Sequence, residues 1–231
     1  MYVELVSKTH GVGKYEGLTS EEIVAAVARH GVIKEDNGKL VKYLMDNAHW
    51  SPLQHIFFSF RVETSRAISA QIFRHRSLNF QETSQRYQEI QEFENISLRR
   101  EHPVNRQSST EWMANINHSS RFISTNGKLS DEENQFNYEM LQLLENVEST
   151  YKKGLELGIS KECMRMILPM CSKTTIHISG TLRDLMAFLN VRLDPHSQEE
   201  VREIAYEIGK ILENELPGVF GQIRWREGMF M

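Results

Sequence analysis

The sequence predicts an α+β fold in which helices dominate. Apolar residues recur at helical spacing over several long stretches, and the short stretches with strand character do not alternate regularly with helices. No internal repeat or low-complexity linker interrupts the chain, and its 231 residues suffice for one sizeable core. We therefore expect a single domain over residues 1–231, built on a central, mostly antiparallel sheet that is flanked by long helices.

Local patterns predict the elements of the N-terminal half. Residues 2–6 have the character of a short strand. Thr19 begins the sequence T-S-E-E, which is typical of a capping box with Glu22, and Gly31 is suited to end that helix. Further predicted elements are a helix over 39–48, a strand over 55–63 with one apolar face, and a helix from about 65 to 76.

The C-terminal half contains the longest predicted helix, over 131–157, with Gly158 at its end. Residues 95–130 before it are polar and show no clear periodicity, so we expect a surface excursion there. The remaining predicted elements are a short helix from Ser160 to Ile167, a strand over 171–179, a helix capped by Thr181 and Asp184, and a last helix from Asp194-Pro195 to Pro217-Gly218.

Composition excludes several classes of protein. Hydrophobic residues make up 40% and charged residues 25%, as in an ordinary globular protein. The net charge of -4 and the pI near 6.2 argue against a general nucleic-acid binder. The sequence contains no apolar stretch of membrane-spanning length and no secretion signal, so we expect a cytoplasmic protein without a membrane partner.

The segment RHRSLNFQETSQRY, which begins at Arg74, is the densest group of polar side chains. On a helix, Gln71 would share a face with Arg74 and His75, and along an extended chain Ser84 and Arg86 would point to the same side. Guanidinium and hydroxyl groups suit phosphate oxygens, and amides suit a base edge. The same residues also fit a solvated loop, and their chemistry alone does not separate the two interpretations.

The sequence contains R-H-R, then seven residues, then Ser, and this pattern resembles the signature of the flavin-dependent thymidylate synthases. Arg74-His75-Arg76 followed by Ser84 fits it without a gap. Other segments are similar to the family's in order and spacing: AHWSPLQHIFFSF (48–60), RMILP (165–169) and LRDLMAFLNVRLDPHSQ (182–198). The resemblance covers most of residues 40–215.

The resemblance implies two ligand sites. For dUMP it implies contacts from Gln71, Arg74, Glu82, Ser84, Gln85, Arg86, Arg165 and Arg192, with Ser84 and Arg86 toward the phosphate and Arg165 supplied by a neighbouring subunit. For FAD it implies contacts from His49, Ser51, Arg74, His75, Arg76, Glu82, Thr181 and Arg183. The sequence departs from the family's pattern at Thr181 and Ala187, at the adenine end of the FAD site.

The resemblance also implies an activity: reductive methylation of dUMP to dTMP, with 5,10-methylenetetrahydrofolate as carbon donor and FAD reduced by NADPH. It implies a homotetramer whose active sites are shared between subunits. Arg192 would be the catalytic residue, because a permanent cation beside the uracil stabilises negative charge on the ring.

Cys163 and Cys171 match no zinc or redox pattern, and we expect both to be buried. We therefore predict that the reaction needs no cysteine nucleophile. No HxxxH pattern or carboxylate cluster suggests a metal site, so we expect no bound metal. Two other classes of function remain open. One is a nucleotide- or flavin-binding protein without catalysis. The other is a nucleic-acid-binding module built on the R-H-R segment with Arg99, Arg100 and Arg106, which the acidic pI disfavours.

Overall fold

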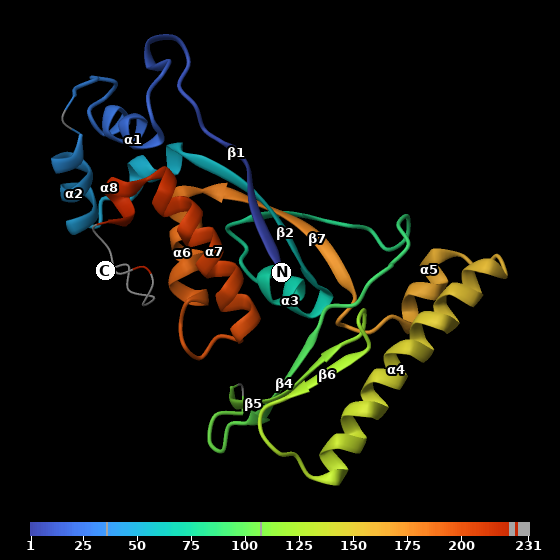
Figure 1. Ribbon diagram of the computed structural model, residues 1–231. Coiled ribbons are helices and arrows are strands. Elements are labelled where there is room, and N and C mark those ends of the chain that lie inside the picture. Colours follow the sequence, from blue (N-terminus) through green and yellow to red (C-terminus); the bar gives the residue numbers. More distant parts are fainter. Residues whose placement is uncertain (36, 107, 222–224, 226–231) are drawn as a thin grey trace. The chain divides into compact units, whose positions relative to one another are not determined.

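The computed structural model describes residues 1–35, 37–106, 108–221 and 225. Helices and antiparallel sheets confirm the predicted α+β class (Figure 1). Internal contacts divide the chain into two compact units. Unit 1 comprises Met1–Val62, Ile72–Gln81 and Ile176–Met231, and unit 2 comprises Glu63–Gln71 and Glu82–Thr175. That residues 1–231 form a single domain stays a prediction.

A four-stranded sheet has the strand order β1-β2-β7-β3, formed by β1 (Tyr2–Lys8), β2 (Phe57–Ser65), β7 (Lys173–Thr181) and β3 (Asn79–Glu82). The amide of Leu182 donates to the Ile56 carbonyl at one end of the β2–β7 pair, and that of Arg66 to the Ser172 carbonyl at the other. This pattern is antiparallel. The strands predicted over 55–63 and 171–179 are therefore confirmed, each shifted by two residues.

The core of unit 1 lies under the apolar face of these strands. Phe58, Phe60, Ile176 and Ile178 are all fully buried, as their alternation in the sequence predicts. The helices of unit 1 are α1 (Ser20–Ala28), α2 (Gly38–Asp46), α6 (Leu182–Arg192), α7 (Glu199–Glu215) and α8 (Pro217–Phe220), with short 3-10 turns η1 (Gly13–Tyr15) and η2 (Ser51–His55).

Both predicted capping boxes of unit 1 are present, Thr19 with Glu22 on α1 and Thr181 with Asp184 on α6. The predicted start of the last helix at Asp194-Pro195 is wrong. The Asp194 carboxylate accepts a hydrogen bond from the His196 amide at 2.7 Å, and this turn keeps the chain out of a helix until Glu199.

Unit 2 contains α3 (Arg66–Ile72) up to Gln71, α4 (Asp131–Glu156), α5 (Lys161–Met164), the turn η3 (Arg165–Ile167), and a second sheet. That sheet has the order β4-β5-β6, from β4 (Ile96–Glu101), β5 (Ser109–Asn117) and β6 (Phe122–Thr125). The prediction of a surface excursion over 95–130 is therefore wrong.

The strand pattern of this second sheet is obscured by its polar outer face. There Asn115 is paired with Ser97 and Ser124 on the two neighbouring strands, and register shifts at Arg99 interrupt the alternation. The inner face packs on α4, where Ile116 meets Leu144 in one buried cluster.

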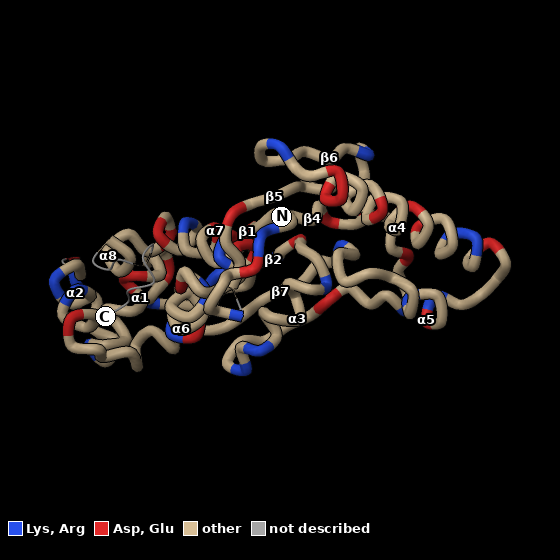
Figure 2. The backbone as a smooth tube through the Cα atoms, turned by 90° about the horizontal axis from the view of Figure 1, so that it is seen from below, with Lys and Arg blue, Asp and Glu red and all other residues tan. Residues whose placement is uncertain are grey.

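Helix α4 confirms the predicted long helix and ends before Gly158, whose φ is +82°. A capping box between Ser130 and Glu133 begins it. Acidic residues occupy its first turn and Lys153 its last, as the helix dipole favours, and Figure 2 shows both signs of charge along it. None of the helices described in the structure is long and apolar enough to span a membrane.

Candidate functional site

The R-H-R residues lie in the turn that follows α3, within unit 1. The prediction that Gln71, Arg74 and His75 share one helical face is wrong, because α3 ends at Ile72. The amide of His75 donates to the Ile72 carbonyl at 3.1 Å, and the chain then turns toward β3. Gln71 is half-buried in the last turn of α3, while Arg74 is exposed beyond its end.

His75 and Arg192 meet directly in unit 1. The Nε–H of Arg192, the last residue of α6, donates to Nε2 of His75 at 2.6 Å. The Phe188 ring contacts the imidazole edge-on, with 4.9 Å between the ring centroids. Burial, and secondarily the charge of Arg192, lowers the pKa of His75 to about 4. His75 is therefore neutral near pH 7 and accepts the hydrogen bond that holds Arg192.

Burial also lowers the pKa of Arg192 from its ordinary value. A guanidinium nevertheless remains charged throughout the working pH range of proteins. The arrangement therefore presents a half-buried cation that is oriented by a neutral imidazole.

Three further arginines of the predicted FAD site are exposed in unit 1: Arg74, Arg76 and Arg183. None of the three forms an ion pair with any residue that the structure describes. Exposed guanidinium groups without carboxylate partners suit phosphate oxygens, which they can bind through two N–H groups at once. This donor set fits the pyrophosphate of a dinucleotide such as FAD.

The other predicted FAD residues of unit 1 begin helical segments or lie next to them. His49 is exposed after α2 and contacts the Tyr43 ring edge-on at 5.6 Å, and Ser51 is the exposed first residue of η2. The Thr181 hydroxyl donates to Oδ2 of Asp184 at 2.5 Å while it caps α6. The hydroxyl proton of Thr181 is thus engaged within the protein, so the hydroxyl oxygen can only accept a hydrogen bond from a ligand.

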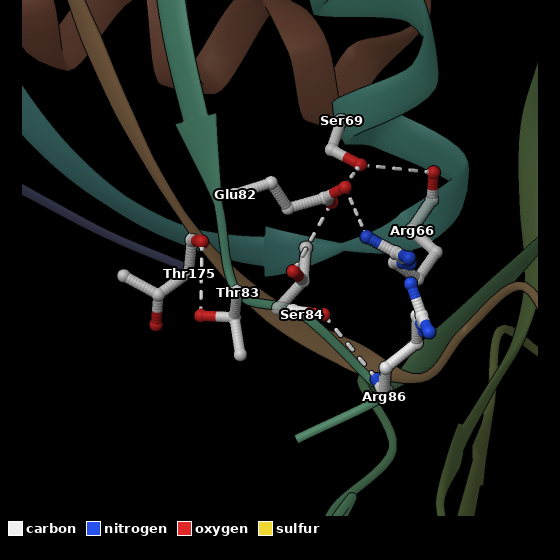
Figure 3. Close-up of polar contacts among 8 residues, drawn as sticks. Arg66, Ser69, Glu82, Thr83, Ser84, Arg86 and Thr175 are labelled. Carbon is white, nitrogen blue, oxygen red and sulfur yellow. Dashed lines mark hydrogen bonds and ion pairs between the residues drawn. The ribbon is translucent and has the colours of Figure 1, made fainter. Parts of the chain in front are cut away.

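Glu82 lies at the end of β3, within unit 2, and is held by three donors (Figure 3). Its Oε1 accepts from the Ser69 hydroxyl at 2.7 Å and from the Thr174 hydroxyl at 3.1 Å. Its Oε2 forms an ion pair with the Arg66 guanidinium. Arg66 and Ser69 belong to α3 and Thr174 to β7, so two elements fix the carboxylate at the end of a third.

The chain turns after Thr83, so the predicted extended arrangement of Ser84 and Arg86 is wrong. The Ser84 carbonyl accepts from the amides of Tyr87 and Gln88, and the Ser84 hydroxyl accepts from the Arg86 amide at 3.4 Å. Figure 3 shows Ser84 and Arg86 side by side in this turn. The intervening Gln85 is buried.

Arg86 forms an ion pair with Glu162 on α5, with Nη2 and Oε2 at 3.1 Å, and both side chains are more than half exposed. Arg165, in η3, is half-buried and forms no ion pair with any residue that the structure describes. The pair to Glu162 therefore brings the turn at Ser84 close to the α5–η3 segment within unit 2.

The predicted ligand residues divide between the units. Unit 1 contains all predicted FAD contacts except Glu82, and unit 2 contains all predicted dUMP contacts except Arg74 and Arg192. Sequence reasoning did not find the partners of these residues, Arg66, Ser69, Thr174, Glu162 and Phe188. The apolar position of Phe188 in the α6 pattern was visible, but nothing in the sequence paired it with His75.

The prediction that both cysteines are buried is wrong. Cys163 in α5 is exposed, and Cys171 is half-buried. Burial raises the pKa of the Cys171 thiol to about 11. Among the residues that the structure describes, His, Cys, Asp and Glu side chains nowhere gather in a group of three or more that could hold a metal ion.

Comparison with known proteins links this arrangement to one family. A family model described as "Thymidylate synthase complementing protein" matches residues 13–218. A "Probable flavin-dependent thymidylate synthase" of Paramecium bursaria Chlorella virus 1 is 32% identical over 231 residues, which cover 97% of this chain and 100% of that protein.

The flavin-dependent thymidylate synthase of Synechocystis sp. is 32% identical to this chain, and the aligned region covers 91% of this chain and 92% of that protein. That of Thermosipho melanesiensis is 33% identical and covers 80% of this chain and 76% of its own length. A matching model over most of the chain, with relatives at this identity and coverage, shows membership. The chain belongs to the flavin-dependent thymidylate synthase family.

Proposed function

We propose that this protein catalyses the reductive methylation of dUMP to dTMP, with 5,10-methylenetetrahydrofolate as carbon donor and NADPH as reductant. The observation that carries the proposal is the family match over residues 13–218, a span that contains the R-H-R segment and Ser84. The relatives that share this span are named as flavin-dependent thymidylate synthases.

FAD is the proposed cofactor, and when bound it supplies the redox chemistry of the reaction. The exposed guanidinium groups of Arg74, Arg76 and Arg183, which form no ion pair with any described residue, support it because they suit the phosphates of the cofactor. The remaining proposed contacts are His49, Ser51, His75, Glu82 and Thr181.

The nucleotide dUMP is the proposed substrate, bound by Gln71, Arg74, Glu82, Ser84, Gln85, Arg86, Arg165 and Arg192. The exposed pair between Arg86 and Glu162 leaves Arg86 able to take a phosphate instead. An exposed ion pair stabilises a protein by about 0–1 kcal/mol, so exchanging it for a doubly charged phosphate is favourable.

Arg192 is the proposed catalytic residue. Its hydrogen bond to His75 limits how the guanidinium can turn, so the cation is in place before charge develops on the substrate. Beside N3 and O2 of uracil, this cation stabilises negative charge on the ring. The resulting electron density at C5 allows that carbon to attack the folate methylene group.

No cysteine nucleophile is needed in this scheme. The pKa of about 11 leaves the Cys171 thiol protonated near pH 7, and a thiol is a weak nucleophile compared with a thiolate. Cys163 is exposed in α5, next to Glu162 in the sequence, and it is the cysteine that a test must address. We expect the variant with both Cys163→Ser and Cys171→Ser to retain turnover, and its inactivity would contradict this part of the proposal.

A homotetramer with shared sites is the proposed assembly, located in the cytoplasm. Support comes from the apolar side chains around Arg165: Met166 is 79% exposed and Met170 60% exposed. Exposed apolar residues beside a proposed ligand residue fit burial against another subunit. Arg165 would then complete the dUMP site of that neighbour.

The proposal is tested by incubating the purified protein with dUMP, 5,10-methylenetetrahydrofolate, NADPH and FAD and measuring dTMP by chromatography. We expect dTMP only when all four are present. A protein that binds FAD and dUMP but forms no dTMP would instead be a binding protein without catalysis.

A further inference from the structure

Glu82 is held by side chains that do not belong to the proposed ligand set. Arg66 pairs with its Oε2, and the Ser69 hydroxyl donates to its Oε1 (Figure 3). The Thr174 hydroxyl also donates to Oε1. All four residues lie in unit 2. Because α3 and β7 both approach the end of β3, the carboxylate is restrained from two directions.

The contacts to Glu82 lie in a largely buried environment, which strengthens them. Ser69 is 2% exposed and Thr174 5% exposed, while the side chains of Glu82 and Arg66 are 18% and 25% exposed. Hydrogen bonds to a charged group are strong where water is scarce. The Ser69 hydroxyl also lies 3.2 Å from the Arg66 carbonyl, but its single proton serves the shorter contact to the charged acceptor.

The number of acceptor positions on Glu82 is limited. A carboxylate can accept about four hydrogen bonds, roughly two at each oxygen. Two hydroxyls occupy Oε1 and the guanidinium occupies one position on Oε2. One position therefore remains, and it is on Oε2.

We propose that Arg66, Ser69 and Thr174 are positioning residues that fix Glu82 so that Oε2 accepts a single hydrogen bond from an N–H or O–H group of bound dUMP. This inference rests on the proposed function. It also refines the proposed function, in which Glu82 contacts both dUMP and FAD: the one open position on Oε2 is assigned to dUMP, so Glu82 does not accept a hydrogen bond from FAD at the same time.

The test removes the hydroxyl donors while keeping side-chain volume. Thr174→Val and Ser69→Ala are made in the otherwise unchanged chain and again in Glu82→Ala, with Glu82→Gln as the second background should Glu82→Ala fail to fold. Thr175→Val is the matched control, because Thr175 contacts Thr83 only through its backbone carbonyl. The dissociation constant of dUMP is measured by calorimetry, and thermal unfolding is recorded for each variant.

In the unchanged chain, we expect Thr174→Val and Ser69→Ala each to weaken dUMP binding roughly threefold to tenfold, as the net loss of one ordinary hydrogen bond does. Neither should weaken it further when Glu82 is already replaced, because positions that act through one group are not additive. Arg66→Met should weaken binding more than either, and Arg66→Lys should recover part of the loss. Thr175→Val should bind like the unchanged chain.

Equal weakening in both backgrounds would overturn the inference, because the residues would then act on the fold and not through Glu82. Unchanged dUMP affinity in Thr174→Val and Ser69→Ala would overturn it as well. The unfolding temperatures distinguish a failure of this inference from a failure of the proposed function. Suppose that Thr174→Val and Glu82→Ala lower the unfolding temperature non-additively but that the unchanged chain does not bind dUMP. The contact between Thr174 and Glu82 is then real, but the proposed function is wrong, and so is the inference that rests on it.

Discussion

At the scale of single residues, the hydrogen bond between Arg192 and His75 joins positions 117 apart in the sequence. The imidazole must be neutral to accept the Nε–H of Arg192, and burial ensures this by lowering its pKa to about 4. The Phe188 ring limits rotation of the imidazole from the side. Each member of this group thus restrains the next, and the guanidinium at its end is the one proposed to act on uracil.

Replacing Arg192 should separate folding from catalysis. We expect Arg192→Ala to lower dTMP formation by at least about a hundredfold, the usual cost of removing a group that stabilises transition-state charge. The unfolding free energy should change by no more than about 1 kcal/mol, because a half-buried cation is removed. Arg121→Ala, at a side chain that is 76% exposed, is the matched control and should leave turnover intact. Full activity in Arg192→Ala would remove its assigned role.

The pKa of His75 also predicts how stability depends on pH. Its ordinary value is 6.5 and its value in the fold about 4, so the unfolded chain binds the proton first as pH falls. The contribution of the neutral ring to stability is therefore complete above pH 6.5 and is lost as pH falls through 4. Unfolding temperatures measured between pH 4 and 8 should decline less for His75→Phe than for the unchanged chain. The exposed His10→Gln is the control, and an identical decline in all three would contradict the prediction.

The proposed ligand residues could be named from the sequence because they follow one another at the spacing of the family's motifs. Their partners could not. Arg66 and Glu162 each form an ion pair with a residue of the R-H-R neighbourhood, but both are charged residues of ordinary surface type. Arg66 and Glu162 become partners because α3 and α5 lie close to Glu82 and Arg86 in the fold. That proximity depends on packing between segments that are distant in the sequence. A single sequence carries no record of that proximity.

At the scale of elements, capping boxes predicted the starts of α1 and α6, whereas the start of α7 and the end of α3 were predicted wrongly. The capping boxes at Thr19 and Thr181 each involve two residues that are three positions apart, so both could be predicted from the sequence. Helix α3 ends at Ile72, and the Phe73 ring just beyond it lies 5.0 Å from the Phe80 ring, a contact that helical periodicity does not reveal. The sheet over 96–125 was missed because its outer face is polar and its alternation is broken near Arg99.

The capping box on α6 gives a prediction with an internal control. Thr181→Ala should lower the unfolding free energy by about 1 kcal/mol, because the hydroxyl caps a backbone amide. It should also weaken FAD binding, since Thr181 is a proposed contact. Thr19→Ala removes the equivalent box on α1 and should cost similar stability without changing FAD affinity. Urea unfolding and flavin absorbance measure the two effects, and equal FAD loss in both variants would contradict the Thr181 assignment.

At the scale of the whole molecule, the proposed ligand residues fall into two sets that follow the compact units except at Glu82, Arg74 and Arg192. Residues for FAD concentrate in unit 1 and residues for dUMP in unit 2. Arg192 in unit 1 is nevertheless proposed to act on the nucleotide, and Arg165 in unit 2 is proposed to serve another subunit. The proposal for Arg165 requires residues of more than one chain to meet at one site.

Sharing between subunits can be measured by complementation. Arg165→Ala and Arg192→Ala chains should each be inactive alone. When the two are co-expressed in equal amounts, about a quarter of the sites in randomly mixed symmetric oligomers should combine an intact Arg165 from one chain with an intact Arg192 from another. Turnover should then recover toward about a quarter of the unmixed, unchanged level. No recovery in confirmed mixed oligomers would mean that both arginines of a site come from the same chain.

The most direct measurement of the central claim is the release of tritium from dUMP labelled at C5 of the uracil ring. The reaction would contain 5,10-methylenetetrahydrofolate and NADPH and would be followed with and without added FAD, using protein first freed of flavin. We expect tritium release that requires FAD and folate and that keeps pace with dTMP formation. Release at an undiminished rate without flavin, or no release when every component is present, would contradict a flavin-dependent methylation of dUMP by this protein.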